Sequence, residues 1–135
     1  MNERNILDRF FGSMQPCDTA TLRDCLTEDA IVWHSFDRVM MRPDDVVKSW
    51  EGMATSFTDR SVTDVRRQQT ATGYVQQHLF VVRGKDGVRK AWPVCIVVQI
   101  RDGRIARLDE YIDLSAAFNP GEGDAVTPGL QNEAI

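Results

Sequence analysis

The spacing of hydrophobic residues changes from helical to strand-like along the chain. Near the N-terminus these residues recur every three or four positions, which predicts a helix over residues 3–14. The buried side of that helix would comprise Ile6, Leu7, Phe10, Phe11 and Met14. Pro16 interrupts the pattern, and Asp18 or Thr19 can cap a short second helix.

A third helix and a series of strands make up the rest of the predicted order. A turn at 28–29 is expected to lead into a strand over 30–36, and residues 38–41 to form a connection. Pro43 suits the first position of the third helix, which would bury Trp50. Four longer strands, separated by glycine-containing turns, are expected over residues 61–71, 74–84, 88–101 and 103–114.

Helices first and a meander of strands last predict an α+β fold, with three N-terminal helices packed on a curved, mostly antiparallel sheet. The helices would cover the concave face only in part and leave a pocket. With 135 residues, the chain is expected to form one domain over 1–118. The segment 119–135 is rich in Gly, Pro and acidic residues and is expected to be a flexible tail.

Charge and composition argue against several classes of partner. The net charge of −4 comes without any basic cluster, so we expect neither nucleic acid nor membrane as a partner. The charged N-terminus and the absence of an apolar run of 18 residues predict a soluble, cytoplasmic protein. Two histidines without metal-ligand spacing, and no phosphate-binding glycine motif, predict neither a metal site nor a cofactor.

One carboxylate has an unusual place in the last predicted strand. Glu110 lies between Leu108 and Ile112 at strand spacing, so the three side chains share a face. If that face points inward, Glu110 needs a partner or a function, because a lone buried charge is costly. His34 shares a face with Val32 in the same way and has a pKa suited to proton transfer.

Three segments of the chain resemble the nuclear transport factor 2-like superfamily, in particular its SnoaL-like and steroid delta-isomerase-like members. These segments are Leu26–His34, Val98–Ile105 and Leu108–Leu114. The resemblance covers roughly residues 3–118. It implies a cone-shaped α+β barrel, often a homodimer through the outer face of its sheet. Members of this fold include isomerases, hydrolases, cyclases, dehydratases and non-catalytic binding proteins.

The sequence keeps only some of the catalytic groups that the resemblance implies. The general base of steroid delta-isomerases falls on His34, but their oxyanion-hole tyrosine falls on Phe10 and their protonated aspartate on Ile96. In limonene epoxide hydrolases the polar helper falls on His34 and one aspartate on Glu110, whereas the arginine falls on Gln77 and the second aspartate on a leucine. His34 and Glu110 are the pair that both comparisons retain.

We expect His34 to act as the general base and Glu110 to orient it, with a purely structural His–Glu pair as the alternative. The resemblance implies that Gln77 points inward and His78 outward. The alternation in 74–84 does not decide this, so His78 stays a possible pocket residue. Further contacts with a substrate are expected from Phe10, Val32, Phe36, Trp50, Met53, Ile96 and Leu108.

Two functions from different classes fit these expectations. The first is a cofactor-free acid–base enzyme of the isomerase, cyclase, dehydratase or epoxide hydrolase type, acting on a small hydrophobic substrate. The second is a non-catalytic module that binds a hydrophobic ligand or associates as a dimer.

Overall fold

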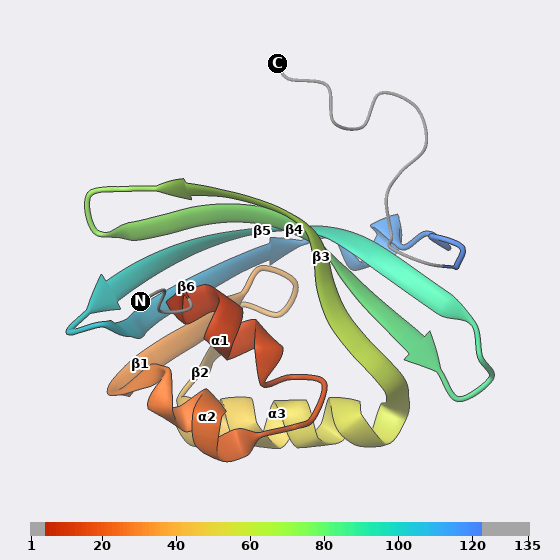
Figure 1. The fold of residues 1–135 in the computed structure, drawn as a ribbon, viewed down its shortest axis with the longest axis horizontal. Coiled ribbons are helices and arrows are strands. Elements are labelled where there is room, and N and C mark those ends of the chain that lie inside the picture. Colours follow the sequence, from red (N-terminus) through yellow and green to blue (C-terminus); the bar gives the residue numbers. More distant parts are fainter. Residues whose placement is uncertain (1–4, 123–135) are drawn as a thin grey trace.

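The computed structural model describes residues 5–122 as three helices on one side of a curved sheet (Figure 1). The helices are α1 (Ile6–Gly12), α2 (Thr19–Asp24) and α3 (Pro43–Ser56). The strands are β1 (Leu26–His34), β2 (Met40–Met41), β3 (Phe57–Gln69), β4 (Gly73–Gly84), β5 (Arg89–Arg101) and β6 (Arg104–Ile112). The predicted α+β class is therefore confirmed.

The sheet is open rather than closed into a barrel. Its strand order is β2-β1-β6-β5-β4-β3, with β1 parallel to β6 and all other neighbours antiparallel. The expected barrel is wrong in this respect, because β2 and β3 remain separate edges. A two-residue β2 offers too little backbone to pair with β3 across the gap. Instead α3 contacts both β1 and β3 and covers that side of the concave face.

The helix starts follow the capping chemistry of the sequence. Asp18 caps α2 as predicted, since its carboxylate accepts a hydrogen bond from the Thr21 amide at 3.1 Å. Pro43 begins α3 as predicted, where its missing N–H costs nothing. The helix expected over 3–14 is shorter, because the described helix ends at Gly12 and passes into turns.

Two of the expected boundaries are wrong around β1. The strand begins at Leu26 and includes Glu28 and Asp29, which were expected to form a turn. Both side chains are exposed, and the pairing with β6 shifts register between Leu26 and Ile31, so the strand accommodates polar residues at an irregular point. The expected connection at 38–41 contains β2, which pairs with β1.

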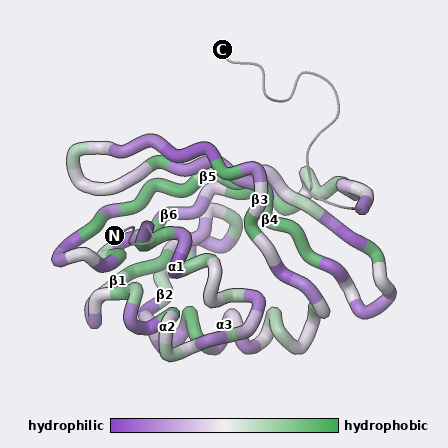
Figure 2. The backbone as a smooth tube through the Cα atoms, viewed as in Figure 1, coloured by the Kyte–Doolittle hydropathy of each residue, from purple (hydrophilic) through white to green (hydrophobic). Residues whose placement is uncertain are grey.

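The hydrophobic core lies between the helices and the concave face of the sheet. Leu7, Leu22, Ile96, Val98 and Ile105 are fully buried there. In Figure 2 hydrophobic residues follow β5 and β6, whereas the edge strand β3 is mostly hydrophilic. The concave face of the central strands therefore supplies the wall on which the helices pack.

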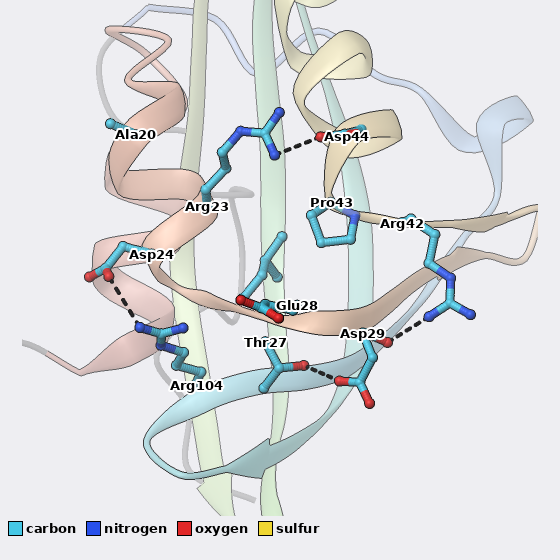
Figure 3. Close-up of a pocket in the computed structure, with 11 residues that line it drawn as sticks. Ala20, Arg23, Asp24, Thr27, Glu28, Asp29, Arg42, Pro43, Asp44 and Arg104 are labelled. Atoms are coloured by element: carbon cyan, nitrogen blue, oxygen red, sulfur yellow. Dashed lines mark hydrogen bonds and ion pairs between the residues drawn. The ribbon is translucent and has the colours of Figure 1, made fainter.

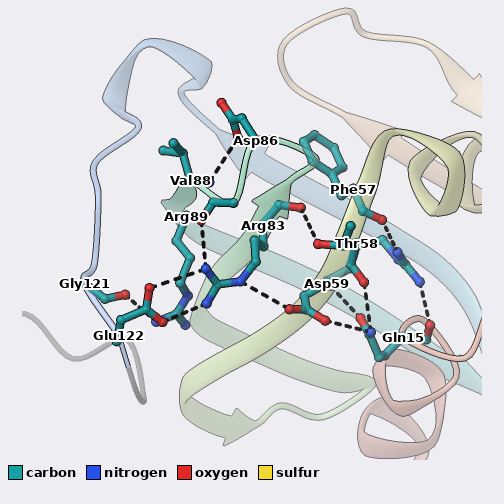
Figure 4. Close-up of polar contacts among 12 residues, drawn as sticks. Gln15, Phe57, Thr58, Asp59, Arg83, Asp86, Val88, Arg89, Gly121 and Glu122 are labelled. Carbon is teal, nitrogen blue, oxygen red and sulfur yellow. Dashed lines mark hydrogen bonds and ion pairs between the residues drawn. The ribbon is translucent and has the colours of Figure 1, made fainter.

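A buried arginine joins the connection after α1 to β3. The guanidinium of Arg60 donates to the carbonyl oxygens of Phe57 at 2.7 Å and Gln15 at 2.5 Å. The Gln15 amide in turn bonds to Asp59 at 3.2 Å (Figure 4). These bonds fix the end of the segment that carries the aromatic residues of α1.

The end of the described chain returns to the β3–β4 edge. Glu122 pairs with Arg83 at 2.7 Å, and Arg83 also pairs with Asp59 at 3.4 Å (Figure 4). Of the expected flexible tail, residues 123–135 lie outside the described residues. Within 5–122, no helix combines the length and the apolar character needed to span a membrane.

Candidate functional site

A cavity of about 200 Å³ lies between the helices and the concave face of the sheet. Its wall is mostly apolar and comes from α1, α3 and all six strands, together with the residues after β6. The polar side chains that line it are His34, Ser49, His78 and Glu110. A cavity of about 150 Å³ in another protein holds benzene, so this one fits a molecule of about one ring.

Most of the expected pocket residues line this cavity. They are Phe10, Val32, His34, Phe36, Trp50, Met53, Leu108 and Glu110. Trp50 and Phe10 pack edge to face, with ring centroids 5.0 Å apart. The contact joins α1 to α3 and makes one rigid aromatic wall.

The expected orientation of β4 is wrong. Gln77 is exposed and lies outside the cavity, whereas His78 is 2% exposed and lines it. Because side chains alternate along a strand, the inward position of His78 forces Gln77 outward. Ile96 is also absent from the cavity wall, since it is fully buried in the core beneath it.

His34 and Glu110 meet because β1 and β6 pair in parallel with these two residues in register. The Nε2 atom of His34 lies 3.6 Å from Oε1 of Glu110. This distance is too long for a hydrogen bond. The Glu110 carbonyl accepts from the Ser35 amide at 2.9 Å, and the imidazole of His34 stacks on Phe36, with centroids 5.1 Å apart. Backbone and ring contacts thus fix the pair, while the side-chain polar atoms stay unbonded within 5–122.

Burial sets the protonation of the pair. It raises the pKa of Glu110 to about 7, because the apolar cavity disfavours the carboxylate. It lowers the pKa of His34 below its ordinary value, although the charge of Asp37 opposes this. Near neutral pH the imidazole is therefore neutral, and the carboxyl group is close to half protonated.

His78 lies in a second polar environment on the same wall. Its Nδ1 atom is 2.9 Å from the amide nitrogen of Gln76, which is itself fully buried. The amide oxygen of Gln76 accepts from Nε of Arg67 at 2.8 Å. Burial, with a smaller effect of the Arg67 charge, lowers the pKa of His78 to about 4. His78 is thus neutral at every pH near 7.

Several wall residues were not expected from the sequence. Phe80 and Trp92 stack with centroids 5.9 Å apart at one side of the cavity, and Leu114 follows β6. The pairing of Phe80 with Trp92 on neighbouring strands could not be read without the register of β4 and β5.

A larger hollow outside the cavity is open and charged (Figure 3). Its volume is about 730 Å³, and it lies among α2, β1 and the start of α3. Arg23 pairs with Asp44 at 2.6 Å, and Arg104 with Asp24 at 3.6 Å. Arg42 donates to the carbonyl of Asp29 at 2.8 Å. The basic side chains of the hollow are thus already paired with groups of the protein itself. The hollow is therefore a weaker candidate for a ligand-binding site than the cavity.

A metal site is not evident in the part of the chain that the structure describes. No group of three or more His, Cys, Asp or Glu side chains lies close enough there to hold an ion. The cavity itself offers two imidazoles and one carboxyl, of which only His34 and Glu110 lie together.

Comparison of the fold with solved structures finds proteins of similar architecture. A protein with a ketosteroid isomerase-like fold from Catenulispora acidiphila, solved with trimethylamine, gives a TM-score of 0.74 at 13% identity over 85% of this chain and 90% of that one. An LEH-like epoxide hydrolase from M. tuberculosis gives 0.70 at 18% identity over 82% of each chain. A candidate polyketide cyclase from Pseudomonas putida gives 0.69 at 18% identity over 82% and 91%.

These identities are low, so the structural likeness establishes the fold alone. No curated protein matches the sequence. The model of the SnoaL-like domain family matches residues 7–108, which is most of the chain. The matched range includes β1, which carries His34. It also includes part of the cavity wall around Glu110, although it ends at residue 108, before Glu110 itself. The chain therefore belongs to the SnoaL-like domain family, within the nuclear transport factor 2-like superfamily.

Proposed function

We propose that this protein is a cofactor-free acid–base enzyme that acts on a small, mostly apolar molecule. The observation that carries the proposal is the pair of His34 and Glu110, whose polar atoms lie 3.6 Å apart in an apolar cavity. No described residue donates or accepts a hydrogen bond at either side chain. Both side chains keep some exposure, 18% for His34 and 20% for Glu110, so a substrate in the cavity can reach the polar atoms of both.

The two groups have complementary protonation states. Neutral His34 can accept a proton from the substrate, and the protonated carboxyl of Glu110 can donate one. This division differs from the expectation that Glu110 only orients His34. To orient the imidazole, Glu110 would have to be ionised and within hydrogen-bond distance of it. Burial disfavours the ionised form, and the distance of 3.6 Å is too long.

Isomerisation, dehydration, cyclisation and epoxide opening all use an acid and a base that act across a small substrate. The names of the similar structures, which include an epoxide hydrolase and a candidate polyketide cyclase, support this range of reactions. The cavity favours a substrate of about one ring, because its volume is about 200 Å³. The partner that we propose is therefore a small hydrophobic molecule.

Two probe substrates test the proposal with purified protein. The first is cyclohex-3-enone, whose conversion to the conjugated enone requires proton removal and return. The second is cyclohexene oxide, whose opening requires protonation of the oxygen. We expect the native protein to turn over at least one of them. Substitution E110Q or H34Q should then reduce kcat by roughly 10²- to 10⁴-fold, the range found for general acid–base groups.

Gln77→Ala is the matched control, because Gln77 is exposed on the opposite face of the sheet. It should retain full activity. If the native protein binds both probes and converts neither, or if E110Q and H34Q keep native turnover, acid–base catalysis by this pair is wrong. The non-catalytic ligand-binding module would then be the better account.

A further inference from the structure

His78 is a buried histidine that the proposed acid–base chemistry does not use. It lines the same cavity as His34 and Glu110 but lies elsewhere on the sheet. Glu110 is opposite Ile96, and Ile96 is opposite Gln76, while His78 is two residues further along β4. The two residues are thus separated by two strand spacings across the sheet and by two residues along β4. Ordinary strand geometry places their backbone positions roughly 12 Å apart. Both side chains line the cavity, so one small molecule can contact both of them.

A chain of side chains determines which nitrogen of His78 carries a proton. Arginine has only donors, so the atom of Gln76 that faces Nε of Arg67 at 2.8 Å must be its oxygen. The amide nitrogen of Gln76 then faces Nδ1 of His78 at 2.9 Å. An amide nitrogen only donates, and Nδ1 must therefore accept. In a neutral imidazole the single proton is then on Nε2.

The upstream end of this chain is also fixed. Arg67 pairs with the Asp8 carboxylate at 2.7 Å, which joins β3 to α1. The ring of Phe11 packs on the imidazole of His78, with centroids 5.2 Å apart and planes at 64°. The plane, the tautomer and the position of the imidazole are thus set by neighbours on three different elements.

The Nε2–H group has no acceptor among the described residues. In that part of the chain, the fully buried polar side-chain atoms without a hydrogen-bond partner are Arg60 Nε and Thr63 Oγ1. Nε2 of His78 is not among them, so it retains open space. That space is the cavity, because His78 is only 2% exposed and lines it.

We propose that His78 is a hydrogen-bond donor of fixed tautomer, which binds a neutral oxygen of the substrate through Nε2–H. The substrate class is therefore an uncharged one-ring molecule with a carbonyl or similar oxygen at the end remote from Glu110. This inference rests on the proposed function, which places the reacting end of the substrate at His34 and Glu110. An anionic substrate fits less well, since the wall holds no cationic side chain and Arg67 is already bound to Gln76 and Asp8.

A neutral imidazole suits this role better than a charged one. Protonation of Nδ1 would place its hydrogen against the N–H of Gln76, which cannot accept it. The low pKa of His78, about 4, agrees with this geometry and keeps the donor constant across neutral pH. His78 would then stabilise charge on the substrate oxygen without joining the proton transfer at the other end.

The tautomer can be measured on the native protein without any ligand. In ¹H–¹⁵N correlation spectra of the imidazole groups, we expect His78 to show a protonated Nε2 and an unprotonated Nδ1 from pH 5.5 to pH 8. A proton on Nδ1, or titration of the ring near pH 6.5, overturns the proposal. This result does not depend on whether the protein is an enzyme.

The donor itself is tested with cyclohexanone labelled with ¹³C at the carbonyl, and with methylenecyclohexane as an isostere that lacks the oxygen. We expect the ketone to bind about fivefold more weakly to H78F than to the native protein, which is the order of one neutral hydrogen bond. The affinity for methylenecyclohexane should stay the same. The carbonyl signal should shift downfield on binding to the native protein and lose that shift in H78F.

Two further variants separate the possible failures. Q77A should behave as native, because its side chain is outside the cavity. E110Q should lose turnover of cyclohex-3-enone but keep the downfield carbonyl shift. An unchanged carbonyl shift in H78F contradicts the donor role, whereas native turnover in E110Q contradicts only the proposed function. If H78F fails to fold, the tautomer measurement on the native protein still decides.

Discussion

At Glu110 a carboxyl group lies in an apolar cavity, and this position couples its protonation to folding. The group ionises near 4.5 when unperturbed, and burial raises its pKa to about 7 in the folded protein. Between these values the folded state binds more protons than the unfolded state, so stability falls as pH rises. The contribution is complete below pH 4.5 and is lost as pH rises through 7.

Replacement of Glu110 by Gln tests this coupling, because Gln resembles the protonated carboxyl. Below pH 4.5 the two proteins should be about equally stable. Above pH 7.5 E110Q should be more stable by up to about 3 kcal/mol, since the difference between the two pKa values corresponds to that energy. Urea unfolding at a series of pH values measures the difference.

The stability of E110Q must be compared with that of the native protein at each pH, because His78 changes stability with pH in the opposite direction to Glu110. Burial lowers its pKa to about 4, so His78 contributes stability above pH 6.5 that is lost as pH falls toward 4. Substitution of the exposed Glu28 by Gln serves as the control and should change stability by less than about 0.5 kcal/mol. If the gain from E110Q were the same at every pH, burial would not be the cause.

At this scale the sequence indicated the pair but not the whole site. Strand spacing placed Glu110 and His34 on inward faces, and the parallel register of β1 and β6 brings them together. The sequence could not show whether Gln77 or His78 points into the cavity, because β4 carries polar and apolar residues on both faces. The orientation of β4 depends on Arg67 of the neighbouring strand β3. Its guanidinium gives Gln76 a hydrogen-bond partner, so Gln76 and His78 can be buried on the same face.

At the scale of elements, the contact of β4 with β5 requires a glycine at position 73. A Cβ atom there would lie 1.9 Å from the carbonyl oxygen of Val98, a backbone atom held in the sheet. We expect Gly73→Ala to destabilise the protein by at least about 2 kcal/mol, because the strands must move apart. The change would appear as a lower urea midpoint.

Gly52 provides the matched control on α3. A Cβ at this position meets nothing within 4 Å, and the residue lies inside the helix. Gly52→Ala should stabilise the protein by up to about 1 kcal/mol, because Ala has the higher helix propensity. Equal effects of the two substitutions would show that the contact with Val98 does not limit the pairing of the strands.

The element boundaries show which local signals can be read from a sequence. Caps were informative, since Asp18, one of the two expected caps, caps α2, and Pro43 begins α3 as predicted. The start of β1 was missed, because Glu28 and Asp29 resemble a turn and their side chains are exposed within an irregular strand. Strand pairing, rather than local preference, decides such a segment.

At the scale of the whole molecule, the outer face of the sheet presents aromatic residues. Trp33 and Tyr111 pack edge to face with centroids 5.4 Å apart, and Tyr111 is 49% exposed. We propose that two copies associate through this face. Tyr111→Glu should weaken the dimer by at least about tenfold, because a charge would be desolvated in each copy.

Sedimentation equilibrium measures this association. Val88→Glu is a suitable control, because Val88 is exposed in the turn between β4 and β5. It should leave the dimer unchanged. A native protein that sediments as a monomer at high micromolar concentration would exclude the proposed association.

The overall shape was predictable only in part. The order of helices and strands gave the α+β class and the concave face, because these follow from local periodicity. Closure into a barrel was not determined by local pattern, and the two-residue β2 leaves the sheet open. Helix α3 contacts both β1 and β3 and lines the cavity on that side.

The central claim is that His34 and Glu110 form an acid–base pair poised near neutral pH. The most direct measurement is the titration of the Glu110 side-chain carboxyl by ¹³C NMR in the native protein, with E110Q used to assign the signal. We expect a midpoint near pH 7, with the pKa of His34 below its ordinary value because of burial. A midpoint near 4.5 would mean that the carboxylate is ionised at neutral pH, and it would contradict the role of Glu110 as the acid.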